Sequence, residues 1–228
     1  MVTIGKINTL EVYKFVDFGA YLDGEQYGPI LLPKKYMPEH IEIEDTIDVF
    51  VYLDSEDRLI ATTESPKAMV GDFALLTAKD VNDFGAFMDW GLIKDLFVPF
   101  KEQKLKMQPG KDYWVYVYID DKTERIVATA KIGRYLSQTE PQLSVGDEVE
   151  IRVHSKTDLG YKVIVNNAFW GVIYANEVFE PIQIAERRTG FVNAIRDDFK
   201  LDIRLQKSGF AKVPDVQKQI LQALKQHN

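Results

Sequence analysis

Apolar and polar residues alternate in short runs along most of the chain. The clearest run is Asp45–Leu53, where every second residue from Ile47 onward is apolar. A period of two predicts a half-buried β-strand. Similar runs, broken by turn residues such as Asp23-Gly24-Glu25, predict five strands in the first 64 residues, at 4–16, 18–22, 27–32, 45–53 and 58–63.

The same order of segments then recurs. Strands are predicted at 72–81, 84–89, 92–100, 113–119 and 125–131. The stretch Asp17–Tyr21 returns as Asp83–Phe87, 66 residues later, and Arg58–Thr62 returns as Arg125–Thr129, 67 residues later. Landmarks that stay in register indicate a duplicated domain, and the period is too long for one solenoid unit but suits a small β-barrel.

A third, more divergent series follows, with strands predicted at 145–154, 163–166, 169–174, 188–196 and 201–205. Lys156–Tyr161 stands where the repeated stretch is expected. Leu159 replaces the aromatic residue before the glycine, and we interpret Tyr161 as the aromatic residue that follows it. From Pro214 the apolar residues have helical spacing, with proline at or near the first turn.

These elements predict an all-β fold class, with three tandem OB-type five-stranded barrels. The predicted domains are 1–66, 67–133 and 143–207, followed by a C-terminal helix at 213–228. This helix either packs on the third barrel or is the first helix of a further domain.

The repeated stretch predicts where a ligand binds. A glycine inside an alternating apolar run marks a bulge, a bend or a close approach of backbones. Aromatic residues flank each glycine: Phe18 and Tyr21 in the first repeat, Phe84 and Phe87 in the second. Rings turned outward on a curved sheet form a stacking platform for the bases of single-stranded nucleic acid. The alternative is packing in the core or between domains.

The net charge differs between the repeats. The net charge of −7 lies entirely in residues 1–66, where 13 acidic residues face five basic ones. Residues 67–133 are neutral and the remainder carries +1. A phosphate backbone is repelled by an acidic surface. The second and third repeats are therefore the better candidates for RNA, and the first is the better candidate for a protein partner.

Several other classes of function find little support. The chain has no cysteine, so no disulfide or thiolate zinc site is expected, and no apolar run is long enough to cross a membrane. His40, His154 and His227 lie in unlike contexts, and no phosphate-binding loop or nucleophile motif is present. We expect a protein without catalytic residues, metal or cofactor, and the cytoplasm as its location.

The repeats resemble a known family. Phe18-Gly19-Ala20-Tyr21 and Phe84-Gly85-Ala86-Phe87, each followed by an acidic turn and an arginine, look like S1-type RNA-binding domains. With Leu-Leu-Pro-Lys-Lys at 31–35 and Val-Pro-Phe-Lys at 98–101, the chain resembles the bacterial conserved virulence factor B (CvfB) family over essentially its whole length. The resemblance implies three S1-type barrels followed by a winged-helix domain, of which the C-terminal helix would be the beginning.

The resemblance also implies which residues meet RNA. In S1-type domains these are two aromatic residues around Gly-Ala, a histidine on the third strand, and an acid–base pair near the fourth turn. The histidine is replaced here, by Leu32, Val98 and Tyr174. The pairs are Asp54 with Arg58, and Asp120 or Asp121 with Arg125, for which an ion pair within the turn is the alternative role. The expected RNA-binding residues are Phe84, Phe87, Arg125, Phe18, Tyr21, Arg58, Tyr161 and Tyr174.

Two functions follow as hypotheses. The first is a single-stranded RNA-binding regulator that acts post-transcriptionally on gene expression, including virulence genes, as the family resemblance implies. The second is a protein-interaction scaffold that docks on ribosome or RNA polymerase components through the acidic first barrel. The basic doublet Arg187-Arg188 is predicted to lie in a solvated loop.

Overall fold

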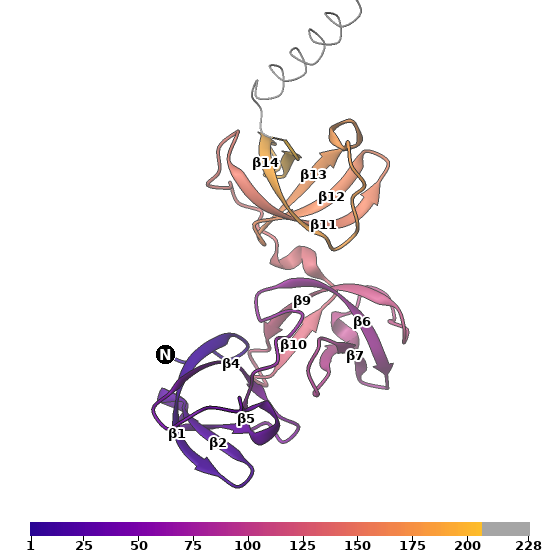
Figure 1. The fold of residues 1–228 in the computed structure, drawn as a ribbon. Helices are drawn as coiled ribbons and strands as arrows, with labels where there is room; N and C mark the ends of the chain where they lie inside the picture. The colour runs from indigo at the N-terminus through magenta and orange to yellow at the C-terminus, as the bar shows by residue number, and fades with distance from the viewer. Residues whose placement is uncertain (207–228) are drawn as a thin grey trace, which may run out of the picture. The chain divides into compact units, whose positions relative to one another are not determined.

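The computed structural model describes residues 1–206, which form three closed barrels of five strands each (Figure 1). The predicted all-β class and the three OB-type barrels are confirmed. Residues 1–135 make one compact unit that contains the first two barrels, and a second unit begins at Leu136. The helix predicted from Pro214 lies outside the described residues, and the predicted domain limits stay predictions.

The three barrels share one topology. In the first, the strands are β1 (Ile7–Val16), β2 (Gly19–Asp23), β3 (Pro29–Pro33), β4 (Thr46–Leu53) and β5 (Leu59–Thr62). In the second, they are β6 (Phe73–Val81), β7 (Gly85–Asp89), β8 (Leu96–Pro99), β9 (Asp112–Ile119) and β10 (Ile126–Thr129). In the third, they are β11 (Glu148–Thr157), β12 (Gly160–Val165), β13 (Phe169–Tyr174), β14 (Arg187–Ile195) and β15 (Leu201–Arg204). In each barrel the third and fifth strands pair in parallel and close the sheet.

Short 3-10 helices fill several of the connections: η1 (Glu25–Tyr27), η2 (Lys34–Tyr36), η3 (Phe100–Glu102), η4 (Ile132–Tyr135) and η5 (Ala175–Glu177). Three of them, η2, η3 and η5, follow the third strand of their barrel directly. No helix in residues 1–206 combines the length and the apolar character that a bilayer crossing demands.

Several predicted strands have other bounds than the observed ones; the strand predicted at 163–166, for example, is β12 and begins at Gly160. The strand predicted at 92–100 is only β8, because the indole of Trp90 donates to the carbonyl of Lys94 at 2.6 Å and holds the preceding residues in a turn. The strand predicted at 145–154 begins later and runs to Thr157, where it pairs with Gly160. The stretch Lys156–Tyr161 therefore belongs to two paired strands and the turn between them.

A glycine opens the second strand of every barrel because the backbones approach closely there. A Cβ atom on Gly19, Gly85 or Gly160 would lie 2.2, 2.3 or 2.1 Å from a backbone oxygen of the neighbouring third strand. No side chain fits such a space, and φ angles of +159° at Gly19 and +139° at Gly160 disfavour other residues further. Of the roles considered for this glycine, the close approach of two strands is the one observed.

The first two barrels share part of one core. Phe50 of β4 is fully buried and packs with the core of the second barrel, its ring centroid 5.7 Å from that of Trp90 in an edge-on contact. Tyr52 stacks on Phe50 at 5.9 Å. The residues that connect the two barrels bond to both of them: the amide of Lys67 donates to the carbonyl of Trp90, and the amide of Val70 donates to the carbonyl of Gly5. The segment 65–70, which reads as a simple linker, is thus packed against both barrels.

The glycine in β7 predicts a large effect of a small substitution. Gly85→Ala places a methyl group against the carbonyl of Val98, so strands β7 and β8 must separate. We expect the free energy of unfolding to fall by at least about 1–3 kcal/mol, the range for an overpacked site. Denaturant titration measures this change. Gly133→Ala is the control, because no atom stands near its Cβ position and its φ is not in the left-handed region. Equal losses in the two variants would contradict the role of Gly85.

The shared core predicts a loss of stability at high pH. Burial, together with the nearby Tyr36, Glu64 and Asp54, raises the pKa of Tyr52 to about 12. In the unfolded chain a tyrosine ionises near pH 10, so between about pH 10 and 12 only the unfolded state loses this proton. The free energy of unfolding should therefore fall as the pH rises through this window. In Tyr52→Phe the fall should be smaller by up to roughly 2 kcal/mol, measured by denaturant titration at each pH; an unchanged fall would show that other groups cause it.

Candidate nucleic-acid interface

An open hollow lies beside the repeated stretch of the second barrel. It has a volume of about 630 Å³ and is lined by residues from β7, β8, β10 and the turn of the first barrel that precedes β5: Ser55, Asp57, Phe84, Phe87, Lys94, Asp95, Phe97, Arg125, Ile126 and Val127. Three of the predicted site residues, Phe84, Phe87 and Arg125, come together here. Aromatic rings and charged groups thus meet at one surface.

Phe84 is presented to solvent by a turn. The side-chain carbonyl of Asn82 accepts hydrogen bonds from the amides of Phe84 at 2.9 Å and Gly85 at 3.3 Å. The ring of Phe84 is 75% exposed. This turn, which is one residue longer than its counterpart between β1 and β2, depends on Asn82, a residue that the repeat comparison passed over. Asparagine two residues before an aromatic-glycine pair is the signal in the sequence that indicates this turn.

Phe87, on β7, lines the same hollow as Phe84. Its ring centroid is 5.1 Å from that of Phe97 on β8, directly across the strand pair. Both side chains are half-buried. Phe87 therefore packs partly against its own barrel, which was the alternative to a role in RNA binding, whereas Phe84 is exposed.

Arg125 does not pair with Asp120 or Asp121, which corrects the expected acid–base pair. Its guanidinium bonds to the carboxylate of Asp57 in the first barrel. Asp120 instead accepts a hydrogen bond from the hydroxyl of Thr123 at 2.9 Å, within its own turn. The reason is tertiary: the packing of the two barrels brings a carboxylate to Arg125 that is distant in the sequence.

Lys94 is a member of the site that sequence reasoning missed. Its ammonium donates to the backbone oxygen of Asp54 at 2.6 Å and lies 3.8 Å from the carboxylate of Asp57. Desolvation by burial lowers the pKa of Lys94, against the opposing effect of Asp57. No local pattern marks this lysine, because its surroundings are supplied by the other barrel.

The first barrel presents a similar pair of rings in a different electrostatic setting. Phe18 is 57% exposed, and its centroid lies 6.5 Å from that of Tyr21 in an edge-on arrangement. Arg58 donates through Nε and Nη2 to Asp54 at 2.9 and 2.8 Å and pairs with Glu56 at 3.1 Å. For Arg58 the ion pair within the turn is therefore what the structure shows. Burial alone would raise the pKa of Asp54, but hydrogen bonds from Arg58 and Glu56 hold it below its usual value.

In the third barrel the register of the strands corrects two equivalences. Gly160 pairs with Tyr174 as Gly19 pairs with Pro33 and Gly85 with Pro99. Tyr174 therefore corresponds to these prolines and not to Leu32 and Val98. The hydroxyl of Tyr174 accepts a hydrogen bond from Arg196 at 2.8 Å, and Arg196 is paired with Asp202 at 2.6 Å.

Tyr161 is likewise not the counterpart of Tyr21 and Phe87. It pairs with Ile173 as Ala20 pairs with Leu32, and its side chain packs against the core of the third barrel. The residue in the register of Tyr21 and Phe87 is Lys162, whose ammonium lies 3.6 Å from the centroid of Trp170. Counting from the glycine would have given this equivalence, because Lys162 is two residues after Gly160, as Tyr21 is after Gly19.

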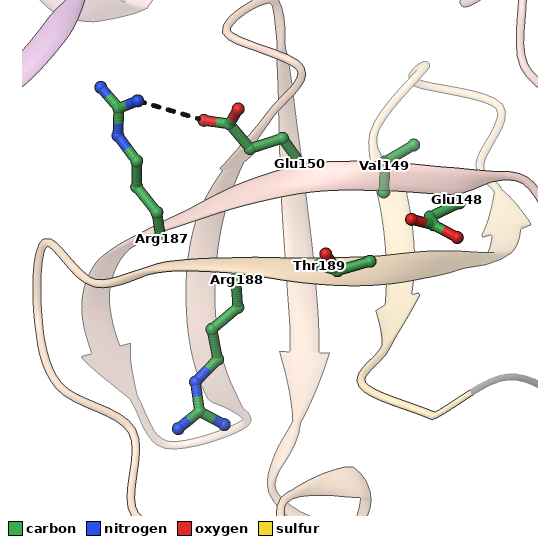
Figure 2. A pocket seen from close by; sticks show the side chains of 6 residues that line it. All are labelled: Glu148, Val149, Glu150, Arg187, Arg188 and Thr189. Atoms are coloured by element: carbon green, nitrogen blue, oxygen red, sulfur yellow. Dashed lines mark ion pairs between the residues drawn. The ribbon is translucent and has the colours of Figure 1, made fainter.

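Arg187 and Arg188 are the first two residues of strand β14 and do not lie in a loop as predicted. Figure 2 shows Arg187 and Arg188 on opposite sides of β14, as successive residues of a strand must be. Arg187 pairs with Glu150 at 3.8 Å, and Arg188 donates to the backbone oxygen of Pro181 at 3.1 Å. The adjoining hollow of about 480 Å³ is lined by two glutamates and contains no aromatic ring. It therefore lacks the stacking surface found in the second barrel.

Metal chemistry has no visible site in the described part of the chain. Among residues 1–206 no group of three or more histidine, aspartate or glutamate side chains is arranged to hold a metal ion. The chemistry that the second barrel's hollow offers is stacking on Phe84, Phe87 and Phe97, with charged hydrogen-bonding groups at its rim.

Comparisons with known proteins agree with the observed fold. A family model described as the S1 domain matches residues 4–64 and 70–131. The uncharacterised protein YitL of Bacillus subtilis (strain 168) is 28% identical over 215 residues, which cover 88% of this chain and 70% of YitL.

Two solved structures are also similar. One is a multidomain protein with nucleic acid binding domains from Streptococcus pneumoniae TIGR4, with a TM-score of 0.48 and 20% identity, covering 98% of this chain and 81% of that one. The other is Drosophila Unr CSD456, with a TM-score of 0.22 and 12% identity, covering 90% of this chain and 98% of that one.

The two matches to the S1 domain model fall on the first two barrels, and together they span more than half of the 228 residues. They coincide with the closed five-stranded topology and with the exposed aromatic residues beside a glycine. The chain therefore belongs to the S1 domain family, whose barrels bind nucleic acid.

Proposed function

We propose that the chain binds single-stranded RNA through the outer face of its second barrel. The observation that carries this proposal is the exposed ring of Phe84 beside Phe87 in one hollow with Arg125 and Lys94. Rings of this kind accept any base by stacking, and each stack contributes about 1–3 kcal/mol. The neighbouring cations supply modest contacts to phosphate.

The proposed role is regulation and not catalysis. The resemblance to the conserved virulence factor B family supports an RNA-binding protein that acts post-transcriptionally on gene expression, including virulence genes, in the bacterial cytoplasm. Barrels on one chain raise the effective concentration of each other's binding sites, so weak single contacts combine on a long RNA.

The aromatic platform predicts the effect of its removal. In the double variant Phe84→Ala/Phe87→Ala, oligo-U RNA should bind more weakly by about 1–3 kcal/mol for each lost stack, as measured by fluorescence anisotropy. The matched control is Phe18→Ala/Tyr21→Ala in the first barrel, where we expect a smaller loss because residues 1–66 carry 13 acidic against five basic residues and repel phosphate. An unchanged dissociation constant in the first variant would exclude the second barrel from the RNA site.

The multi-barrel arrangement predicts dependence on length and salt. Labelled oligo-U of two lengths, titrated with the full chain at low and moderate salt, should bind more tightly when longer and more weakly when the salt concentration rises. The slope of the logarithm of the affinity against that of the salt concentration then reports how many phosphates are contacted, at about 0.7 for each phosphate of a single strand. Affinity that is independent of both would contradict the proposal.

A second candidate is a scaffold that docks on a basic protein, such as a component of the ribosome or of RNA polymerase. The observation in its favour is a run of exposed acidic side chains on the first barrel, at Glu39, Glu42, Glu44, Asp45 and Asp48. A complete lack of RNA binding at low salt would favour the scaffold over the RNA-binding regulator.

A further inference from the structure

The hollow of the second barrel has a wall made by the first barrel. Ser55 and Asp57, from the turn between β4 and β5, line it together with the rings of β7 and β8. Its volume of about 630 Å³ exceeds that of one nucleobase. A base stacked on Phe84 or Phe87 would therefore have its edge close to a group of the other barrel.

This wall is held in place by contacts within one compact unit. Lys94 donates to the backbone oxygen of Asp54, Arg125 bonds to Asp57, and below them Phe50 packs on Trp90. Asp57 has a φ of 60°, a left-handed conformation that aspartate tolerates better than most residues, at the point where the turn reverses. The carboxylate of Asp57 is thus part of the hollow and not a mobile side chain on a distant surface.

The polar groups at the rim retain hydrogen-bonding capacity. Oδ2 of Asp57 accepts from Nη2 of Arg125, while Oδ1 lies 3.8 Å from the ammonium of Lys94. An ionised carboxylate offers about four acceptor positions, and a guanidinium carries five N–H donors in a fixed fork. An acceptor and a donor therefore stand side by side above an aromatic platform.

We propose that Asp57 of the first barrel is a specificity-determining residue of the second barrel's RNA site and that it selects guanine. Guanine is the base whose Watson–Crick edge places two donors, N1–H and the 2-amino group, next to an acceptor, O6. The carboxylate of Asp57 accepts from both donors, and Arg125 or Lys94 donates to O6. Unstacked bases in single strands are read on this edge. The inference rests on the proposed RNA-binding function of the same face.

The other bases match this rim less well. Uracil presents a single donor between two carbonyl oxygens, so one of these oxygens would face the carboxylate. Adenine and cytosine each present one amino group beside a ring nitrogen that accepts, and they leave the carboxylate with one hydrogen bond. An acceptor that a bound base covers without giving it a hydrogen bond loses its water, which makes the discrimination larger than the contact alone.

The test uses the full chain and four labelled eight-nucleotide RNAs, U-rich and identical except for a central G, A, C or U. In fluorescence anisotropy the RNA with G should bind at least about fivefold more tightly than that with U, the lower end of what one bidentate contact discriminates. Replacing the G by inosine, which lacks the 2-amino group, should remove most of this preference without any change in the protein.

The variant Asp57→Asn should bind all four RNAs with nearly equal affinity. Its binding of the all-U RNA should be unchanged or tighter, because Arg125 is released toward phosphate. Glu56→Gln is the matched control: it removes one charge from the same turn but does not line the hollow, so the preference for G should persist. Equal thermal midpoints would show that both variants fold.

Three results would overturn the inference: equal binding of all four RNAs by the original chain, a preference for A, C or U, or a preference for G that survives in Asp57→Asn. The first two leave the proposed RNA-binding function intact, since the RNAs still bind. Lack of binding by every RNA is a different outcome, because it refutes the proposed function and the inference with it.

Discussion

The pairing of the second and third strands of each barrel depends on the near contact of their backbones at the start of the second strand. Gly19, Gly85 and Gly160 stand so close to the third strand that a single methyl group would meet a carbonyl oxygen. The same contact turns the preceding residue outward, since the carbonyls of Phe18, Phe84 and Leu159 each accept a hydrogen bond from the residue after the third strand. The close packing of the second and third strands and the exposure of the residue before the glycine therefore occur together in all three barrels.

The first two barrels share this strand pairing, but the charged residues around it differ. Arg58 and Arg125 occupy matching places, yet Arg58 is bound by two carboxylates of its own turn and Arg125 by a carboxylate of the other barrel. An exposed ion pair contributes little stability. What changes between the two barrels is thus the origin of the carboxylate beside the arginine, which comes from the same turn for Arg58 and from the other barrel for Arg125.

At the junction of the first two barrels, the first barrel contributes residues to the core and to the surface of the second. Phe50 completes the core of the second barrel, and the turn that carries Asp57 forms part of the wall of its hollow. The first barrel thereby contributes both packing and polar groups to a surface that the second barrel could not build alone. The acidic repeat, which repels phosphate in general, supplies at this one place a carboxylate that a base edge can use.

The sequence by itself determined the class of fold, the repeat and the aromatic residues that flank its glycine. Alternation of period two fixes which residues of a strand face inward, and a glycine flanked by rings marks a close approach of two strands in both repeats, so Phe84 and Phe87 could be named from the sequence. Only the tertiary structure decided the partner of Arg125, the participation of Lys94 and the inward position of Tyr161. The physical reason is distance along the chain: local patterns encode which side of a strand a residue takes, whereas the contact of Asp57 with Arg125 exists only because two barrels pack through Phe50 and Trp90.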